Sequence, residues 1–312
     1  MTEITDTRTA EPELAQGFDG FDPRIPSYPR VWPYLLDLSK DAYPADRDFA
    51  RALWENIPGM LRVAWSRQLG RCALAHYLAR SGIGQIIVAG TDLPCNDLEI
   101  HEIAWNTNPA TRTVYADRDK LAVVYAQALF RGPGTRPAVH AAPGDADALL
   151  DAAAEHVDLH ERVAVLFVTS LDLLDKTTAA RAIRRITART VDGSAVGIVH
   201  LGARDRATAR LLPSLAADHG AAVPCLRGPA EVAALFPPGM RLVRPGIFDV
   251  MTWLDSAAFP DGPGHAPQVD GLSVWCAVAR TPRSPFNGSA RRVLGRLTGG
   301  YAPRLALPGC TP

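Results

Sequence analysis

The chain has 312 residues, of which 47% are hydrophobic and 21% charged, which is ample for a folded core and excludes a wholly disordered protein. Its 33 basic and 33 acidic residues cancel, so the charge of the whole chain favours neither nucleic acid nor an anionic membrane. Five cysteines without a Cys-x-x-Cys pair predict neither a zinc site nor a disulfide framework. There is no signal-peptide pattern and no apolar run of the roughly 20 residues that a membrane helix needs, so we expect a soluble, cytoplasmic protein.

Composition divides the chain into three parts. Residues 1–20 are polar and aperiodic, which predicts a disordered N-terminus. Residues 21–280 are expected to form one domain, with a helical cap over 21–84. Residues 281–312 are rich in arginine and contain no acidic residue, so we expect a flexible basic tail. An element that docks on a partner or contacts RNA is the alternative for this tail.

The cap begins with an irregular stretch. Phe18–Tyr34 carries several prolines and aromatic residues and is expected to be ordered but irregular. Apolar residues at helical spacing then predict helices over Asp46–Glu55 and Pro58–Ser81, and Gly82 and Gly84 end the second of them.

From Gln85 onward, strands and helices alternate, which is typical of a mostly parallel sheet covered by helices on both faces. The strands are expected at Ile86–Ala89, Thr113–Ala116, Ala138–Ala141, Val163–Val168, Ala195–His200, Met240–Val243 and Leu272–Ala279. The helices are expected at Lys120–Phe130, Thr177–Thr190, Thr208–His219 and Gly228–Leu235. The pattern predicts an α/β, doubly wound, Rossmann-like fold.

Several motifs occur in a fixed order along this domain. They are the stretches Arg30–Arg47, Gly90–Cys95, Ile100–Glu102 and Leu242–Gly246. In content and order they resemble the motifs of the actinobacterial S-adenosyl methyltransferase family, formerly a domain of unknown function. The resemblance implies a class I methyltransferase fold with S-adenosylmethionine (SAM) as cofactor.

The resemblance also implies where the cofactor binds. The loop that starts at Gly90 would approach the methionine end of SAM, and Asp117 at the end of the second strand would bind the ribose hydroxyls. Arg118 or Asp119 would lie beside the adenine. The cofactor-binding residues implied in this way are Arg30, Tyr34, Lys40, Gly90, Thr91, Asp92, Asp117, Arg118, Ala142 and Thr169.

Several positions depart from the family pattern, among them Leu38 and Ser39, which replace paired glycines before Lys40. Val88 and Asp92 stand where the first strand and its loop typically have aspartate and glycine, and Ala142 replaces an aspartate often found beside the adenine. The Asp92 carboxylate would bind the methionine ammonium or obstruct the cofactor, and it would be strained if the backbone needed a positive φ there. If Asp92 obstructs the site, Asp92→Gly is expected to strengthen cofactor binding.

Other polar residues near the strand ends are candidates for contact with a substrate. His101 and Glu102 follow the first loop on a predicted helix, where a capping or surface role is the alternative. Thr169, Ser170 and Asp172 follow the fourth strand, at the edge where ligands bind in this architecture. Because a sulfonium donor is already activated, methyl transfer needs no particular acid or base, and no catalytic residue is assigned.

Two functions remain open. The first is SAM-dependent methyl transfer to a small-molecule acceptor of unknown identity. The alternative is a degenerate methyltransferase fold that serves as a non-catalytic partner-binding or regulatory module, or as a repurposed non-methylating enzyme, which the departures at Val88, Asp92 and Ala142 favour. A nicotinamide oxidoreductase is disfavoured because the first loop has no Gly-x-Gly-x-x-Gly.

Overall fold

The computed structural model describes residues 21–37, 40–94, 99–254 and 271–281. The predicted disordered N-terminus (1–20) and nearly all of the predicted basic tail (281–312) lie outside this range. The described strands are β1 (Gln85–Ala89), β2 (Arg112–Asp117), β3 (Val139–His140), β4 (Ala164–Val168), β5 (Ala195–Ala203), β6 (Arg241–Leu242), β7 (Phe248–Asp249) and β8 (Leu272–Arg280).

All eight strands belong to one sheet, in which the path β3-β2-β1-β4-β5-β8-β6 is hydrogen-bonded and β7 pairs with β8. The strands β3, β2, β1, β4 and β5 are parallel, whereas β8 runs antiparallel to β5 along its whole length. The order of the strands reverses between β1 and β4, and in such sheets ligands bind beyond the carboxyl ends at that point. The topology confirms the predicted doubly wound, mostly parallel fold.

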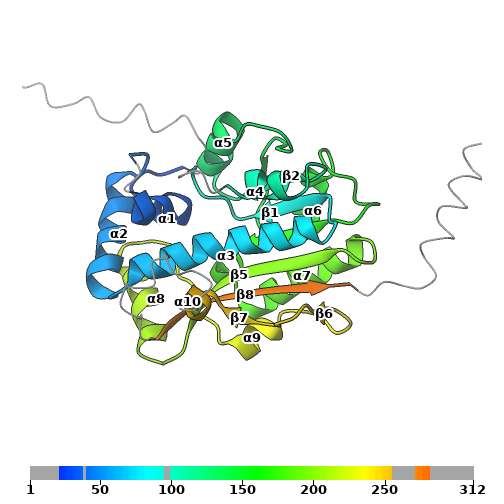
Figure 1. Cartoon of the computed structure of the whole chain (residues 1–312). Helices are drawn as coiled ribbons and strands as arrows, with labels where there is room; N and C mark the ends of the chain where they lie inside the picture. The colour runs from blue at the N-terminus through cyan, green and yellow to red at the C-terminus, as the bar shows by residue number, and fades with distance from the viewer. Residues whose placement is uncertain (1–20, 38–39, 95–98, 255–270, 282–312) are drawn as a thin grey trace, which may run out of the picture.

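Helices cover both faces of the sheet (Figure 1). They are α1 (Tyr28–Asp37), α2 (Pro44–Asn56), α3 (Met60–Arg80), α4 (Ile100–Thr107), α5 (Lys120–Leu129), α6 (Ala146–Ala153), α7 (Lys176–Arg189), α8 (Thr208–Asp218), α9 (Pro229–Ala233) and α10 (Val250–Leu254), with a short 3₁₀ helix η2 (Leu171–Leu173). Most predicted elements are present with ends shifted by a few residues. The elements α1, α6, α10 and β7 were not predicted.

The lead-in is therefore partly helical, which corrects the expectation of an irregular segment over Phe18–Tyr34. Pro33 lies inside α1 and cannot donate to the carbonyl of Pro29, one turn earlier. The backbone N–H of Leu93 donates to that carbonyl instead, at 2.9 Å. The bond both satisfies the proline-containing helix and ties α1 to the loop that follows β1.

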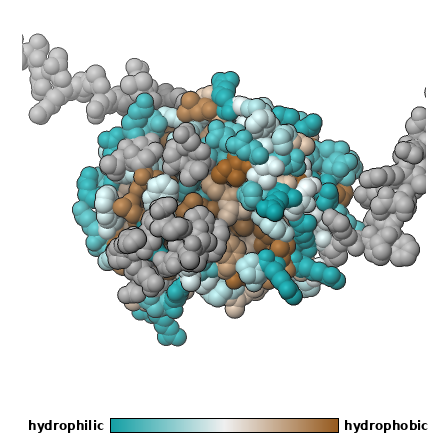
Figure 2. Space-filling view, in the orientation of Figure 1, coloured by the Kyte–Doolittle hydropathy of each residue, from teal (hydrophilic) through white to brown (hydrophobic). Residues whose placement is uncertain are grey.

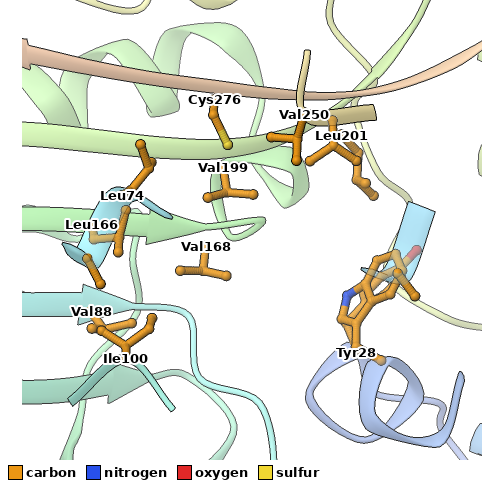
Figure 3. Packing of buried hydrophobic residues seen from close by; sticks show 14 of the residues in the cluster. Tyr28, Leu74, Val88, Ile100, Leu166, Val168, Val199, Leu201, Val250 and Cys276 are labelled. Carbon is orange, nitrogen blue, oxygen red and sulfur yellow. The ribbon is translucent and has the colours of Figure 1, made fainter. Parts of the chain in front are cut away.

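The two faces of the sheet bury separate hydrophobic cores. Alternate residues of a strand point to opposite faces, so Val88 and Leu166 pack in the first core, while Ile87 and Val165 pack in the second. The first core also contains Leu74 of α3, which lies beside Leu166 in Figure 3. The helices α6, α7 and α9 supply the second core. Because helices cover both faces of the sheet, successive residues of the central strands are apolar, which explains the continuous apolar runs in the sequence.

The longest helix, α3, crosses one face of the sheet (Figure 1) and is buried along most of its length. Gly70 lets it approach the sheet, because a Cβ there would lie 2.7 Å from Sγ of Cys276 on β8. The helix carries four arginines and no acidic residue. Three of these arginines, Arg62, Arg67 and Arg71, are buried, so their partners must come from other elements.

Candidate functional site

A cleft of about 910 Å³ lies at the carboxyl ends of β1, β2, β3 and β4. Each strand end contributes a lining residue: Gly90 after β1, Asp117 on β2, Ala142 after β3 and Thr169 after β4. Eight residues expected to bind the cofactor line this cleft, namely Arg30, Gly90, Thr91, Asp92, Asp117, Arg118, Ala142 and Thr169. The structure therefore brings together most of the predicted site.

Two predicted residues are not brought to this cleft. Tyr34 is half-buried against the first core, with the guanidinium of Arg47 6.0 Å from its ring centroid. Lys40 is exposed, and neither side chain is part of the cleft lining in the described chain. Their contact with the cofactor stays a prediction that rests on the family resemblance.

The loop after β1 is held by the end of β2. The Asp117 carboxylate accepts hydrogen bonds from the backbone N–H groups of Thr91 and Asp119, both at 2.7 Å. Gly90 has φ 102°, and a Cβ there would lie 2.6 Å from the carbonyl oxygen of Val168, so this position requires glycine. Burial raises the pKa of Asp117 to about 7, despite the two hydrogen bonds that favour its charged form.

The hydroxyl of Thr91 is buried at the cleft without a hydrogen-bond partner among the described residues. Its side chain lines the cleft although the residue is only 3% exposed. The Oγ1 atom has no hydrogen-bond partner among the described residues. Because an unsatisfied buried hydroxyl is costly, its place beside Asp117 fits a polar ligand bound across the strand ends.

Asp92 forms a buried ion pair with Arg67 of α3, a residue that the sequence analysis did not assign to the site. The Asp92 oxygens accept from Nη1 and Nη2 of Arg67 at 2.6 and 2.8 Å. The two side chains are 4% and 2% exposed, and both residues line the cleft. This parallel, two-bond geometry is the strongest that a guanidinium and a carboxylate form.

Arg67 also contacts the loop after β4. Its Nε donates to Oγ1 of Thr169 at 2.8 Å, and its guanidinium lies 5.0 Å from the ring centroid of Trp32 on α1. Thr169 has φ 50°, which is unusual for a β-branched residue, and it is the only non-glycine among the described residues with positive φ. One guanidinium thus fixes the loops after β1 and β4.

The contacts of Asp92 bear on two expectations. Its backbone is outside the left-handed region, so the strain that a positive φ would impose does not arise at this position. Its carboxylate is already paired, so Asp92→Gly would leave Arg67 without its main partner in a buried position. The substitution is therefore expected to cost stability.

Two further charges complete this group. Arg71 lies 3.4 Å from Asp92 and 3.5 Å from Glu99. The side chains of Arg71 and Glu99 are both buried. We refer to Arg67, Arg71, Asp92 and Glu99 as the cleft cluster. Its two positive and two negative charges cancel, which is a condition for burying them.

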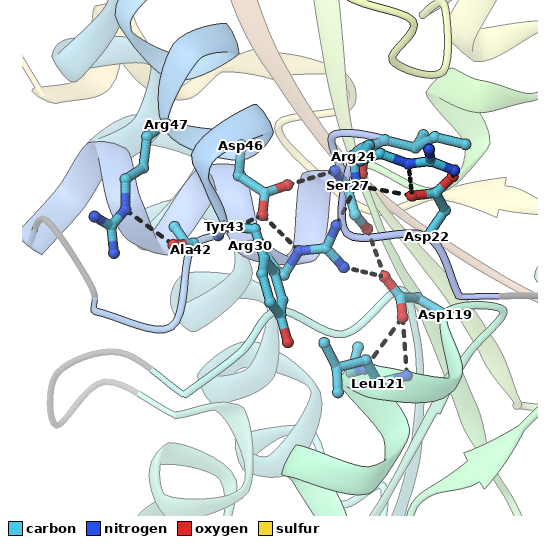
Figure 4. Close-up of polar contacts among 12 residues, drawn as sticks. Asp22, Arg24, Ser27, Arg30, Ala42, Tyr43, Asp46, Arg47, Asp119 and Leu121 are labelled. Atoms are coloured by element: carbon cyan, nitrogen blue, oxygen red, sulfur yellow. Dashed lines mark hydrogen bonds and ion pairs between the residues drawn. The ribbon is translucent and has the colours of Figure 1, made fainter. Parts of the chain in front are cut away.

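Arg30 joins the N-terminal helices to the strand ends (Figure 4). Its Nε donates to Asp46 at 2.7 Å, its Nη1 to Asp119 at 3.3 Å and its Nη2 to the carbonyl of Ile25 at 3.0 Å. Asp119 in turn caps α5 by accepting from Leu121 N at 2.9 Å. Arg30 therefore shapes one wall of the cleft through contacts with other protein groups.

The remaining candidates separate into lining and core residues. Ser170 lines the cleft and donates to the carbonyl of Ala89 at 2.6 Å. His101 is buried against Tyr115, whose hydroxyl lies 3.0 Å from its Nδ1, and burial lowers the pKa of His101. Neither His101 nor Glu102 lines the cleft, so the structure gives no support to their contact with substrate there.

Asp172 lies in a second buried ionic group behind the cleft. Its Oδ1 is 3.1 Å from Nδ1 of His200, and Nη1 of Arg227 donates to Nε2 of His200 at 2.7 Å. Arg227 also donates to the carbonyls of Leu171 and Leu174 at 2.9 and 2.5 Å. We refer to Asp172, His200 and Arg227 as the His200 cluster, and none of the three lines the cleft.

A second, mostly apolar cleft of about 1000 Å³ lies between α3 and the strands β7 and β8. It is lined by Leu69, Tyr77, Phe248 and Val278 among others and contains none of the predicted cofactor residues. Figure 2 shows hydrophobic side chains in the middle of this face of the molecule, with hydrophilic ones around them. In the described residues, no group of three His, Cys, Asp or Glu is placed to hold a metal ion, and no helix has the length and hydropathy to cross a membrane.

The strand order, the cleft at the switch point and an acidic residue at the end of β2 define the class I methyltransferase fold. A protein from Thermobifida fusca YX, described as a candidate methyltransferase, superposes with a TM-score of 0.73 and 24% identity over 83% of this chain and 96% of that chain. A DUF574 family protein from Streptomyces avermitilis MA-4680 gives 0.71 and 28% identity, covering 82% and 98%. The search of curated proteins gave no match.

The model of the S-adenosyl methyltransferase family matches residues 15–282 of this chain. The chain belongs to the S-adenosyl methyltransferase family. This confirms the family predicted from the motifs, and with it a SAM-dependent methyltransferase as the class of enzyme.

Proposed function

We propose that this protein transfers the methyl group of SAM to a small-molecule acceptor that binds in the same cleft. The observation that carries the proposal is the junction of β1 and β2, where Asp117 holds the loop by Thr91 N and the Thr91 hydroxyl is buried without a partner. A cleft of about 910 Å³ falls within the range of small-molecule sites, roughly 300–1,000 Å³.

The strand order gives the cofactor a direction. The adenine would lie at the end of β3, beside Ala142 and Arg118, and the ribose at the end of β2, on Asp117. The amino-acid end would then lie where β1 and β4 end, beside Asp92 and Thr169. The acceptor would enter from the N-terminal wall of the cleft, which includes Phe21 and Ile25.

The departures from the family pattern are compatible with this arrangement. Val88 is buried in the first core, and the loop that an aspartate there would order is held instead by Asp117. Asp92 is held against Arg67, and Ala142 removes a side chain from the adenine end without closing the cleft. No contact in the described structure favours the non-catalytic alternative.

When bound, SAM supplies an electrophilic methyl group on a positively charged sulfur. The contribution of the chain would be to bind and orient, since holding two reactants together removes much of the entropic barrier. Asp117 would hold the ribose, the Thr91 hydroxyl would satisfy a polar atom of the ligand, and the apolar wall would exclude water. We also propose that the reaction takes place in the cytoplasm.

Titration calorimetry with SAM and with S-adenosylhomocysteine (SAH) tests the proposal. We expect micromolar binding, about −8 kcal/mol, for the full chain. Asp117→Ala is expected to weaken it at least about tenfold by removing a charged acceptor, while Asp48→Ala, on the exposed side of α2, leaves it unchanged. If neither ligand binds and neither raises the melting temperature at millimolar concentration, the proposed function fails. Binding would justify a screen of acceptors with methyl-labelled SAM.

A further inference from the structure

We propose that the second cleft, between α3 and the strands β7 and β8, binds a free single-chain apolar carboxylate of the fatty-acid kind, whose carboxylate is held by arginines of β6, β8 and the loop after β6. The proposal goes beyond methyl transfer and does not depend on SAM binding. The helix α3 borders both clefts with different residues: Arg67 lines the cleft at the strand ends, whereas Leu69 and Tyr77 line the second cleft.

The walls of the second cleft suit an apolar ligand body. The helix α3 contributes Leu69, Ala73 and Tyr77, and β8 contributes Val278. The volume of about 1000 Å³ lies at the upper end of the range for small-molecule sites, roughly 300–1,000 Å³. A hydrocarbon chain that fills this space would remove apolar surface of both the ligand and the protein from water.

Three arginines lie near the end of this cleft at which β8 ends. The backbone N–H of Val243, a lining residue, donates to the carbonyl of Val278 at 2.8 Å, and Arg244 follows Val243 in the lining. Arg241 is directly opposite Arg280 in the ladder between β6 and β8, which lie side by side in Figure 1. We refer to Arg241, Arg244 and Arg280 as the β6 arginines.

The β6 arginines have no acidic partner in the described part of the chain. Among the described residues that line the second cleft, Asp249 alone is acidic, and its carboxylate is already paired with Arg204. The positive charge at this end of the cleft is therefore not balanced by the protein, and the charge complement would come from an anion.

Two of the β6 arginines are on the face of the sheet that α3 covers. The guanidinium of Arg280 lies 5.7 Å from the ring centroid of Tyr77 on α3. Directly opposite residues of an antiparallel pair share a face, so Arg241 is on that face too, and like charges in such positions repel each other. Nε and Nη2 of Arg280 are buried without a hydrogen-bond partner in the described structure. An anion bound here would reduce the repulsion and the cost of the unpaired donors.

The apolar walls and the β6 arginines together define the ligand. An uncharged apolar molecule would leave the arginines unpaired, and an inorganic anion would leave the apolar walls exposed to water. A carboxylate on a hydrocarbon chain satisfies both, because guanidinium and carboxylate form charge-assisted hydrogen bonds. The end of the chain, residues 283–312, has five arginines and no acidic residue, so its charge does not complement this site.

Calorimetry on the full chain with three probes tests the proposal. Sodium decanoate has both the hydrocarbon chain and the charge, decan-1-ol has the chain alone, and sodium acetate has the charge alone. We expect decanoate to bind at least about tenfold more tightly than decan-1-ol, and acetate to show no binding at millimolar concentration. Equal affinity for decanoate and decan-1-ol, or no binding of decanoate, would overturn the proposal.

The variant with both Arg241→Gln and Arg244→Gln removes two exposed positive charges. We expect it to bind decanoate at least about tenfold more weakly than the wild type, with less than about a threefold change for decan-1-ol. The matched control, Arg184→Gln with Arg210→Gln, removes two exposed charges that line neither cleft and should change neither affinity. An equal loss of decanoate affinity in the control would show non-specific attraction to net charge and refute the site.

The variant Ala73→Phe locates the ligand body. Ala73 is half-buried on α3 and lines the second cleft, so a phenyl ring there would occupy part of the space. We expect decanoate and decan-1-ol both to bind at least about tenfold more weakly, with an unchanged affinity for SAH. Unchanged decanoate affinity in a variant with the melting temperature of the wild type would place the ligand elsewhere.

Other occupants of the cleft give different outcomes. If the chain binds phosphatidylglycerol vesicles but not dissolved decanoate, the surface is a membrane contact and the proposal is overturned. If sedimentation equilibrium shows a dimer and decanoate does not bind, the cleft is an interface between two copies, which also overturns it. If decanoate binds as expected but SAM and SAH do not, the proposed function fails and this inference stands.

Discussion

The cleft cluster and the His200 cluster are both buried ionic groups near the carboxyl ends of the strands, yet they differ in what they face. In the His200 cluster, Arg227 donates to two backbone carbonyls and to His200, and none of the three members lines the cleft. In the cleft cluster, Arg67 and Asp92 both line the cleft.

This difference teaches how to tell a structural ion group from a functional one. Arg227 and Arg67 each make three hydrogen bonds to protein atoms, so unused donors do not separate the two clusters. What separates them is position: Arg67 and Asp92 line the cleft, where a ligand can reach them, whereas no member of the His200 cluster lines it. Burial alone does not separate the two, because all of these side chains are buried.

The largest expected effect comes from breaking the cleft cluster at one partner. Asp92→Gly leaves the Arg67 charge buried and unpaired, so we expect the free energy of unfolding to fall by about 3–5 kcal/mol. Urea denaturation measures this loss. The double variant Arg67→Gln, Asp92→Asn serves as control and is expected to recover most of the stability, because it leaves no unpaired charge. Unchanged stability with tighter SAM binding would instead show that Asp92 obstructs the site.

Removing one charged partner from the His200 cluster is expected to lower the free energy of unfolding without changing which ligands the cleft prefers. Arg227→Ala removes three hydrogen bonds from a charged donor, and we expect a loss of about 3 kcal/mol in urea denaturation. The ratio of SAH to 5′-methylthioadenosine affinity should stay as in the wild type, in calorimetry under conditions where both proteins are folded. A changed ratio would remove the distinction between the two clusters.

A smaller effect is expected from pH, through Asp117. Burial raises the pKa of this carboxyl to about 7, and the ionised form is the better acceptor for ribose hydroxyls. Cofactor affinity should therefore be full above pH 7 and fall as the carboxyl is protonated, by about tenfold between pH 8 and pH 6. Calorimetry with SAH at the two pH values measures this change.

The variant Asp117→Asn is the control for the pH experiment, and its weaker binding should not vary over the same range. The contribution to stability has the opposite sign. Because the folded-state pKa of Asp117 lies above the unfolded value, the native state binds the proton more tightly, and this group lowers stability as pH rises from about 4 to 7. An unaltered SAH affinity at pH 6 would show that Asp117 is ionised well below neutrality or does not bind the ribose.

The smallest expected effect concerns Thr169. Thr169→Gly relieves the strain of a positive φ, which should stabilise the folded state by about 1 kcal/mol. It also removes the hydrogen bond from Arg67, which should destabilise the folded state by about the same amount. We expect a net change in unfolding free energy of less than about 1 kcal/mol by urea denaturation. SAH affinity should nevertheless fall, because the guanidinium loses one of its two anchors. Equal affinity in wild type and variant would show that Thr169 does not position Arg67.

The sequence was sufficient for every strand of the sheet except β7 and for most of the strand-end residues. Buried parallel strands are continuous apolar runs, as in Val163–Val168, and the residues that follow such strands meet at one edge. This is why Gly90, Asp117 and Thr169 could be placed together before the structure was known. The helix α1 was missed because Pro33 argues against a helix, and its compensation by Leu93 N is a contact between distant segments.

Arg67 was missed for a similar reason. Its partners, Asp92 and Thr169, lie on other elements, and helical spacing alone says nothing about them. A signal was present in the four arginines of α3, which has no acidic residue to pair with them. Two of these arginines, Arg67 and Arg71, are four residues apart and so share one helix face, a pattern that predicts an acidic counterpart elsewhere in the fold.

The position of Arg67 on α3 has a consequence for how the molecule is assembled. It lies 25 residues before Asp92 and 102 residues before Thr169, whereas β1 and β4 pair directly with each other. A chain that started at β1 would keep all the parallel strands and still lack the guanidinium that joins their ends. The helix α3 must therefore be packed on the sheet for the amino-acid end of the cleft to be complete, so the site depends on a segment of the chain that contributes no strand.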